Sequence, residues 1–350
     1  MNFLSSRRVQ SVLAAALIAA GITGISADTR AADPAPGPLT FIDTHAHPVR
    51  NVRRGTMLNA DTVLRIMDAA GIAQTVFLPP PFSAAENRNY GLRELDSLTS
   101  GNPKRLAFVT GGDTLNPMVQ TTPADNVSGS TRDVFVREAE RIASSHAAGF
   151  GEFAAEHFSS GRGAQPYESV PPDHPLLLAL ADIAARTGMP IDLHMEAVTA
   201  DMPTPDRLQG GPNATALHAN IAALERLLTH NPEAKIVWAH AGWDLIGERT
   251  VDLMRTLLTQ HPNLYMSVKI DRGGSPRTAP FDGDGKLRDG WLALLQDFPD
   301  RFLIGSDQFY DNDDTGRLDD ARRFIDALPP ALAHKIALDN PRRVYRGLGG

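Results

Sequence analysis

The feature that most constrains the fold is an alternation, repeated eight times, of short β-rich runs with Ala/Leu-rich stretches of helical spacing. The alternation predicts an α/β protein with a parallel sheet. Eight such units in a chain of 350 residues predict a single-domain (β/α)8 TIM-type barrel. The eight predicted strands cover residues 39–44, 75–78, 106–110, 149–153, 190–194, 235–240, 263–269 and 301–305.

The stretches between these runs carry the periodicity of amphipathic helices. In residues 176–187 (LLLALADIAART) the apolar side chains recur on one helical face. Residues 213–230 and 252–260 repeat the plan, and each is ended by an Asn-Pro or His-Pro pair. A doubly wound open sheet is the alternative, but no G-x-G-x-x-G phosphate loop follows a strand, so the barrel is preferred.

The N-terminal segment has the pattern of a secretory signal peptide, predicted over residues 1–32. Two arginines, Arg7 and Arg8, precede an apolar run over residues 12–25, which is too short to span a membrane. The arginine pair is similar to a twin-arginine signal, but polar residues interrupt the hydrophobic stretch expected directly after the arginines, so Sec export is preferred. We therefore expect a periplasmic or secreted protein.

The predicted barrel domain, residues 39–350, follows a short Pro-rich linker over residues 33–38. Long Gly/Pro-rich segments are expected to form extended loops over one face of the barrel and to shape a substrate pocket. These segments cover residues 112–130, 159–173, 199–212 and 271–286.

The composition excludes several kinds of chemistry and partner. The chain has no Cys, which excludes disulfides, thiolate metal sites and a Cys nucleophile. It has 34 Lys+Arg against 41 Asp+Glu and no basic stripe, which disfavours nucleic acid as a partner. We expect a small-molecule substrate and no membrane contact after signal cleavage, and the sequence leaves a homo-oligomer open.

Polar residues gather at the carboxyl ends of the predicted strands. His45 and His47 are two positions apart at the end of the first strand, so they project to the same side. Those strand ends converge in a closed barrel, and a divalent cation would offset the cost of desolvating the polar side chains there. The other polar residues at strand ends are Glu152, His194, His240 and Asp307.

Four short sequence motifs resemble those of the amidohydrolase-related branch of the amidohydrolase superfamily. They are IDTHAHP (42–48), WAHAG (238–242), LIGSD (303–307) and NPRRVY (340–345), and the resemblance spans about residues 39–347. That branch contains metal-dependent hydrolases, lactonases and non-oxidative decarboxylases built on barrels. The resemblance therefore implies a metal-dependent enzyme.

The resemblance also implies roles for individual residues. His45, His47 and Asp307 would hold the principal metal, and His194 would complete the site as it does in mononuclear members. His240 is similar to the histidine that orients or polarises the substrate in those members. We expect one divalent ion, with Zn²⁺ as the default for a His-rich site and Mn²⁺ as the alternative.

Glu152 is the ambiguous position in this set. In binuclear members of the superfamily a strand-four Glu bridges two metals, and the GEF word at residues 151–153 is similar to such a site. Mononuclear relatives carry a Gly-Glu pair there without using it as a ligand. Glu152 therefore stays open as a ligand, and so does a second metal ion.

The expected mechanism is hydrolysis of an ester, lactone or amide by water that the metal makes acidic. Asp307 would act as general base and later pass the proton to the leaving group, and His240 would polarise the carbonyl. Decarboxylation of a small aromatic or unsaturated acid is the second enzymatic interpretation. A non-catalytic periplasmic ligand-binding barrel is the alternative of another class, and the acidic charge disfavours a nuclease.

Five further residues are candidates for substrate contact. Lys269 ends the seventh strand and Arg272 follows it, so either cation suits a substrate carboxylate. Trp243 follows the WAHAG motif that contains His240, and it is a candidate for the pocket wall. His157 and Arg162 follow the fourth strand and are expected to line the mouth.

Overall fold

The centre of the structure is a ring of eight parallel strands, in which each strand pairs with its two neighbours. The strands are β1 (Phe41–His47), β4 (Ile72–Phe77), β5 (Leu106–Phe108) continued by β6 (Thr110–Gly111), β7 (Phe150–His157), β9 (Ile191–Met195), β12 (Ile236–Ala241), β13 (Leu264–Val268) and β14 (Phe302–Ile304). All eight lie where the sequence predicts a strand, within three residues at most ends.

The ring closes at its third strand, which is interrupted at Val109. Its first half, β5, pairs with β4, whereas its second half, β6, pairs with β7. The Val109 N–H donates to the Phe77 carbonyl at 2.8 Å, and the Thr110 N–H donates to the Gly149 carbonyl at 3.4 Å. Because the two ends of the sheet belong to one stretch of chain, the sheet is a closed (β/α)8 barrel, and this prediction is confirmed.

The coordinates come from a computed structural model that describes residues 38–51, 56–81, 91–159, 166–310 and 315–349. The predicted signal peptide and all but the last residue of the linker lie outside the described residues. Within the described part of the chain, no helix is both long and apolar enough to cross a membrane.

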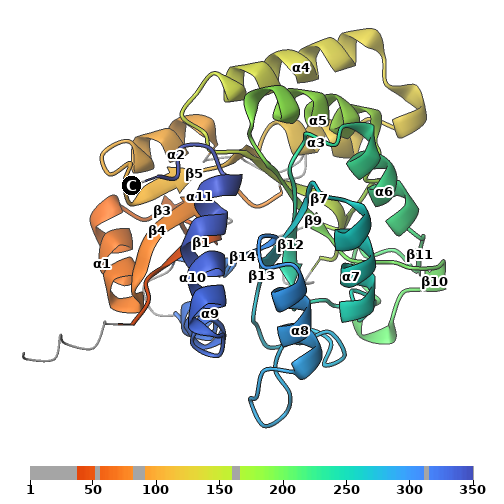
Figure 1. The fold of residues 1–350 in the computed structure, drawn as a ribbon. Helices are drawn as coiled ribbons and strands as arrows, with labels where there is room; N and C mark the ends of the chain where they lie inside the picture. Colours follow the sequence, from red (N-terminus) through yellow and green to blue (C-terminus); the bar gives the residue numbers. More distant parts are fainter. Residues whose placement is uncertain (1–37, 52–55, 82–90, 160–165, 311–314, 350) are drawn as a thin grey trace, which may run out of the picture. The chain divides into compact units, whose positions relative to one another are not determined.

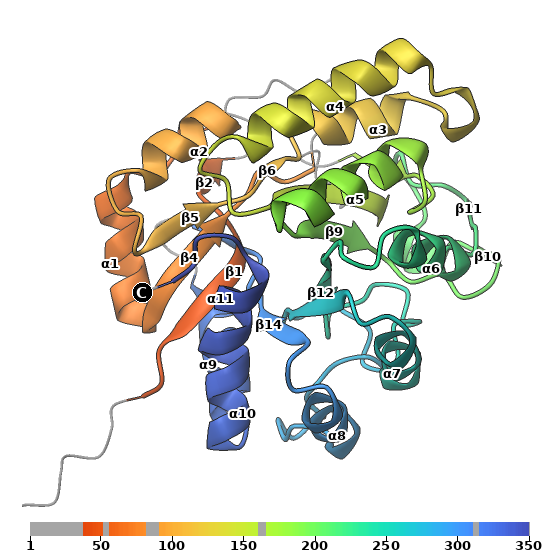
Figure 2. The ribbon, with the colours of Figure 1, turned by 45° about the horizontal axis from the view of Figure 1, so that its top comes forward.

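One helix follows each strand and packs on the outside of the ring (Figures 1 and 2). These are α1 (Ala60–Ala70), α2 (Leu92–Thr99), α4 (Gly129–Ala143), α5 (Pro175–Thr187), α6 (Ile221–His230), α7 (Val251–Gln260), α8 (Asp289–Asp297) and α9 (Gly316–Asp326). Helix α5 buries the predicted apolar face, including Leu176 and Leu180, and ends at Gly188, whose φ of 67° makes the left-handed cap.

Shorter elements decorate the loops and the C-terminus. They are β2 (Val49–Asn51), β3 (Thr56–Met57), α3 (Leu115–Thr121), η2 (Ala124–Asn126), β8 (Glu168–Ser169), β10 (Met202–Pro203), η3 (Asp206–Leu208), β11 (Ala216–Leu217), β15 (Gln308–Phe309), α10 (Pro330–His334), η4 (Lys335–Asp339) and α11 (Asn340–Val344). Two predictions were wrong in detail. The segment 112–130 is partly helical, and the helix expected over 213–230 begins only at Ile221, after β11 has paired with β10.

The loop that follows β12 is fixed by a buried arginine. The Arg249 guanidinium donates to the Met195 carbonyl at 2.6 Å and to the Ala239 carbonyl, and it stacks 4.2 Å from the centre of the Trp238 ring. The Asp244 carboxylate accepts the Arg249 backbone N–H at 2.7 Å. This arrangement ties the loop to the ends of β9 and β12, the two strands that carry His194 and His240.

A second acid, Glu196, completes this buried cluster. Its Oε2 accepts the Leu245 N–H at 2.8 Å. Burial, together with the nearby Asp244 charge, raises the pKa of Glu196 well above its usual value. The hydrogen bond from Glu196 and the nearby Arg249 charge, among other contacts, outweigh burial and lower the pKa of Asp244. In this cluster Asp244 is therefore favoured as the anion opposite the Arg249 cation, and Glu196 is the acid that is protonated more readily.

Candidate metal centre

Two imidazoles on β1 point into the mouth of the barrel, and each is fixed through its Nδ1 atom. His47 Nδ1 lies 2.8 Å from the Leu78 carbonyl oxygen, and His45 Nδ1 lies 3.2 and 3.3 Å from the two oxygens of the Asp192 carboxylate. A carbonyl and a carboxylate only accept, so both Nδ1 atoms carry hydrogen. In the neutral rings the Nε2 lone pairs therefore face the centre of the mouth.

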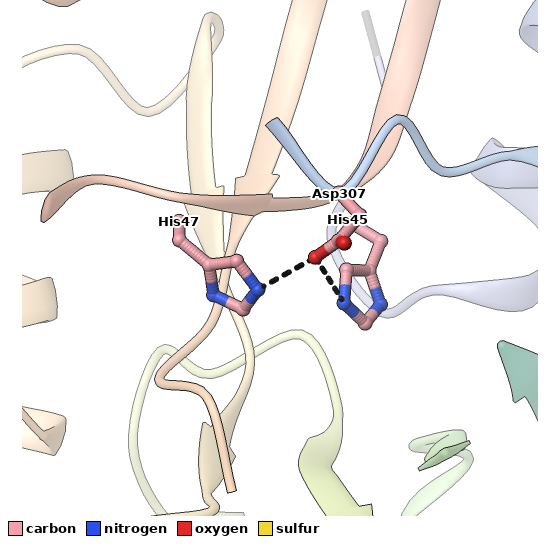
Figure 3. Close-up of side chains that lie close together, drawn as sticks. All are labelled: His45, His47 and Asp307. Carbon is pink, nitrogen blue, oxygen red and sulfur yellow. Dashed lines mark hydrogen bonds and ion pairs between the residues drawn. The ribbon is translucent and has the colours of Figure 1, made fainter. Parts of the chain in front are cut away.

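Two carboxylates face these Nε2 atoms. Asp307 Oδ1 lies 3.0 Å from His47 Nε2 and 3.8 Å from His45 Nε2 (Figure 3). Glu152 Oε2 lies 3.6 Å from His45 Nε2 and 3.8 Å from His47 Nε2. Four groups from three segments of the ring thus gather around one small volume, as the sequence predicts.

The other two histidines approach this group differently. His240 Nε2 lies 3.3 Å from His45 Nε2 and 3.9 Å from Asp307 Oδ1. His194 Nδ1 instead bonds the second oxygen of Glu152 at 2.9 Å. The groups of donor atoms close enough to share one ion are His45 with His47 and Asp307, and His45 with Glu152 and His240. His240 is therefore nearer to a shared ligand position than the sequence predicts, and His194 is farther from it.

The donor set fits a divalent cation because the lone pairs of the histidine Nε2 atoms face the lone pairs of the carboxylate oxygens. Neutral Nε2 atoms set against carboxylate oxygens repel one another unless a proton or a metal ion lies between them. Burial lowers the pKa of His45, but the Asp192 and Glu152 charges outweigh it and hold that pKa well above its usual value. The site therefore attracts positive charge, and its imidazole and carboxylate donors suit Zn²⁺ or Mn²⁺.

Asp307 is held as an anion. Burial raises its pKa, but the nearby Lys269 and Arg317 cations outweigh burial and keep the pKa well below the usual range. Its Oδ2 accepts from Lys269 Nζ at 2.6 Å and from Arg317 Nη1 at 3.0 Å. Lys269 Nζ also lies 3.5 Å from the centre of the Trp243 ring, a cation–π contact. One oxygen of Asp307 is thus occupied by cations, and the other faces the histidines.

The backbone contributes to this geometry at two of the residues. His240 and Asp307 have φ angles of 66° and 56°, in the left-handed region that residues other than glycine rarely adopt. The Asp307 N–H donates to the His45 carbonyl at 2.7 Å, which fixes the chain there. Such conformations cost about 1 kcal/mol or more each and concentrate at functional sites.

A cavity of about 670 Å³ opens above the donor cluster. Among the predicted substrate contacts, His157, Trp243 and Lys269 line it. Arg272 is exposed and does not line it, and Arg162 lies outside the described residues. Sequence reasoning missed two lining cations, Arg207 from η3 and Arg317 from α9, because neither is near a strand end in the sequence.

The sequence matches the family model described as Amidohydrolase over residues 42–347. The match spans every strand of the ring except the first residue of β1, and all six residues that form the donor cluster. This chain belongs to the amidohydrolase family. Members of this family usually bind a divalent metal, and His45, His47, Asp307 and Glu152 are the candidate ligands here. No curated protein matches the chain in sequence.

Similar solved structures include two decarboxylases and a probable hydrolase. A dihydroxybenzoic acid decarboxylase from Polaromonas sp. JS666, with bound manganese and 2-nitroresorcinol, is 15% identical; the match covers 87% of this chain and 96% of that chain, with a TM-score of 0.53. A 2,6-dihydroxybenzoate decarboxylase with its substrate is 14% identical (87% and 98% covered, TM-score 0.50). A probable 2-pyrone-4,6-dicarboxylic acid hydrolase from Acinetobacter baumannii with citric acid is 12% identical (87% and 99%, TM-score 0.49). At such identities the likeness to the two decarboxylases shows the fold alone.

Proposed function

We propose that this amidohydrolase is a metal-dependent hydrolase that cleaves an ester, lactone or amide bond. The observation that carries the proposal is Asp307, a buried carboxylate kept ionised by two cations, with one oxygen facing the histidines at the floor of the cavity. A carboxylate so placed is available to take a proton from water in the cavity.

The proposed metal ligands are His45, His47 and Asp307, with His194 or Glu152 completing the set. A divalent ion held there would supply Lewis acidity, which polarises a carbonyl oxygen and makes water more acidic. We propose Zn²⁺ or Mn²⁺ as the ion. The manganese bound in the Polaromonas decarboxylase structure supports Mn²⁺.

The residues of the chain would then divide the proton transfers. Asp307 accepts the proton of the attacking water at Oδ1 and returns it to the leaving oxygen or nitrogen, so no proton is gained or lost overall. Lys269 and Arg317 stay on Oδ2 and orient the carboxylate. Burial and the nearby Lys269 charge hold the pKa of His240 well below its usual value, so the ring is neutral and donates a hydrogen bond to the substrate carbonyl.

Decarboxylation of a small acid is the second candidate function, and the charge of the cavity wall supports it. Three cations, Arg207, Lys269 and Arg317, line the cavity, and a cationic wall suits an acidic substrate. Two of the structures with this fold are decarboxylases of dihydroxybenzoates.

We also propose that the protein works outside the cytoplasm, because of the signal-like pattern in residues 1–32. An exported enzyme meets external esters, lactones and amides directly, which favours hydrolysis over a reaction that depends on a cytosolic pathway. The cellular location is testable by fractionating cells that produce the full chain.

The reaction type is tested with the metal-loaded protein and a panel of lactones, esters, amides and aromatic acids in water enriched in oxygen-18. Hydrolysis places the heavy oxygen in the product acid and releases no CO₂. The proposal is wrong if turnover instead releases one CO₂ per molecule of an aromatic or unsaturated acid. It is also wrong if the metal-loaded chain binds such compounds without converting them, which would support a ligand-binding barrel.

Metal addition to the metal-free protein is expected to raise its melting temperature. An ion that binds only the folded chain adds about 2.7 kcal/mol at a free concentration of one hundred times its Kd. His47→Ala should abolish the increase, because His47 Nε2 is a proposed ligand. His146→Ala, a change at an exposed histidine, should retain it. The melting temperatures are measured by differential scanning calorimetry. Equal metal-induced increases in the two variants would exclude His47 as a ligand.

A further inference from the structure

The C-terminal motif NPRRVY contacts the barrel through its first and last residues. Asn340 Nδ2 donates to the Pro299 carbonyl at 2.9 Å and to the Phe302 carbonyl at 2.8 Å, which fixes the start of α11 against β14. Tyr345 follows α11, and its side chain is buried to 2% exposure. The proposed reaction uses neither residue, so the position of the Tyr345 hydroxyl calls for a separate explanation.

The Tyr345 hydroxyl meets the acid that holds His45. It donates to Asp192 Oδ2 at 3.4 Å, and the same carboxylate lies 3.2 Å from His45 Nδ1. Asp192 is two residues before His194 on β9, so both side chains point to the inside of the ring. A chain of contacts therefore runs from the C-terminal segment, through a strand-five carboxylate, to a proposed metal ligand on β1.

We propose that Asp192 and Tyr345 form a positioning pair for His45, through which the C-terminal segment completes the metal centre. This inference rests on the proposed metal-ligand role of His45. Asp192 fixes the tautomer and orientation of His45 and makes its Nε2 more electron-rich. Tyr345 holds the carboxylate in place.

The surroundings suit these two roles. Asp192 is 1% exposed and His45 is fully buried, so water does not compete for either. Burial and the Asp192 charge raise the pKa of Tyr345 well above its usual value, so the hydroxyl keeps its proton and acts as a donor to the carboxylate. A hydrogen bond to a charged group in such a setting is stronger than one between neutral groups.

The test measures metal affinity, by chelator competition with Zn²⁺ and with Mn²⁺, in the full-length protein. We expect Asp192→Asn to weaken binding about 10- to 100-fold, as is typical for a group that orients a metal-binding histidine. Tyr345→Phe should weaken it less, by roughly 2- to 10-fold, the loss of one hydrogen bond. The double variant should bind no more weakly than Asp192→Asn alone, since Tyr345 acts through Asp192.

Tyr310→Phe is the matched control. Tyr310 is a fully buried tyrosine whose hydroxyl lies 3.2 Å from the Thr75 hydroxyl. Its removal should leave metal affinity unchanged, and the melting temperatures of the metal-free variants separate weaker binding from a damaged fold. Wild-type affinity in Tyr345→Phe, or losses that add in the double variant, would overturn the inference while leaving the proposed function intact. A wild-type chain that binds no divalent metal would overturn both.

Discussion

Asp307→Asn is expected to lower kcat by roughly 10²- to 10⁴-fold, the usual contribution of a general base. The substitution keeps the shape of the side chain but removes the charge that Lys269 and Arg317 pair with, and it leaves Oδ1 a poor proton acceptor. The variant should remain folded, because asparagine also tolerates the left-handed backbone at this position. The measurement is turnover per bound metal ion on whichever substrate the panel identifies, with circular dichroism to check the fold.

Asp300→Asn is the control for this prediction. Asp300 also pairs with two cations, Lys335 at 2.7 Å and Arg343 at 3.0 Å, but it is partly exposed and does not line the cavity. Its turnover should match that of the wild type. Near-normal turnover in Asp307→Asn at full metal content would exclude Asp307 as the proton acceptor.

Arg249→Met is expected to lower the free energy of unfolding by about 3–5 kcal/mol. The substitution leaves the buried Asp244 charge without its cation and removes the donors to the Met195 and Ala239 carbonyls. Methionine fills much of the same space, so the loss reflects charge and hydrogen bonding more than a cavity. Denaturation in urea, followed by circular dichroism, gives the free energy directly.

Arg277→Ala provides the comparison, because Arg277 is an exposed arginine 3.6 Å from Glu248, a neighbour of Arg249 in the loop after β12. An exposed pair of this kind contributes at most about 1 kcal/mol. Comparable losses in the two variants would show that the buried cluster does not stabilise the fold. A loss of unfolding free energy confined to Arg249→Met would show that the buried cluster holds the loop after β12 in place.

The sequence was sufficient for the fold because each βα unit carries its own local pattern. Strand and helix periodicity located all eight strands, and Asn231 and His261 ended α6 and α7 as their Asn-Pro and His-Pro pairs predict. The interruption at Val109 was not predictable, because it depends on how two neighbouring strands share one stretch of chain. The short helix α3 was missed because Pro117 lies inside it and Pro123 follows it, a pattern typical of a loop.

The site was predictable to the level of residue type and strand end, and less so in its contacts. Strand ends brought His45, His47 and Asp307 together as expected. Sequence position could not show that His194 turns to Glu152 while His240 turns to His45, since that depends on rotamers and on a left-handed backbone. Contacts between segments far apart in the chain, such as that of Tyr345 with Asp192, carry no local signal in the sequence.

The left-handed residues His240 and Asp307 have a consequence for engineering this protein. At both positions a glycine would relieve backbone strain, because glycine adopts positive φ angles freely, but at Asp307 it would also leave the buried Lys269 without its carboxylate, which costs more than the strain. The same exchange would remove an imidazole or a carboxylate from the floor of the cavity. Selection for heat resistance alone would therefore protect Asp307 but not His240, and a programme to stabilise the protein has to keep both residues constant.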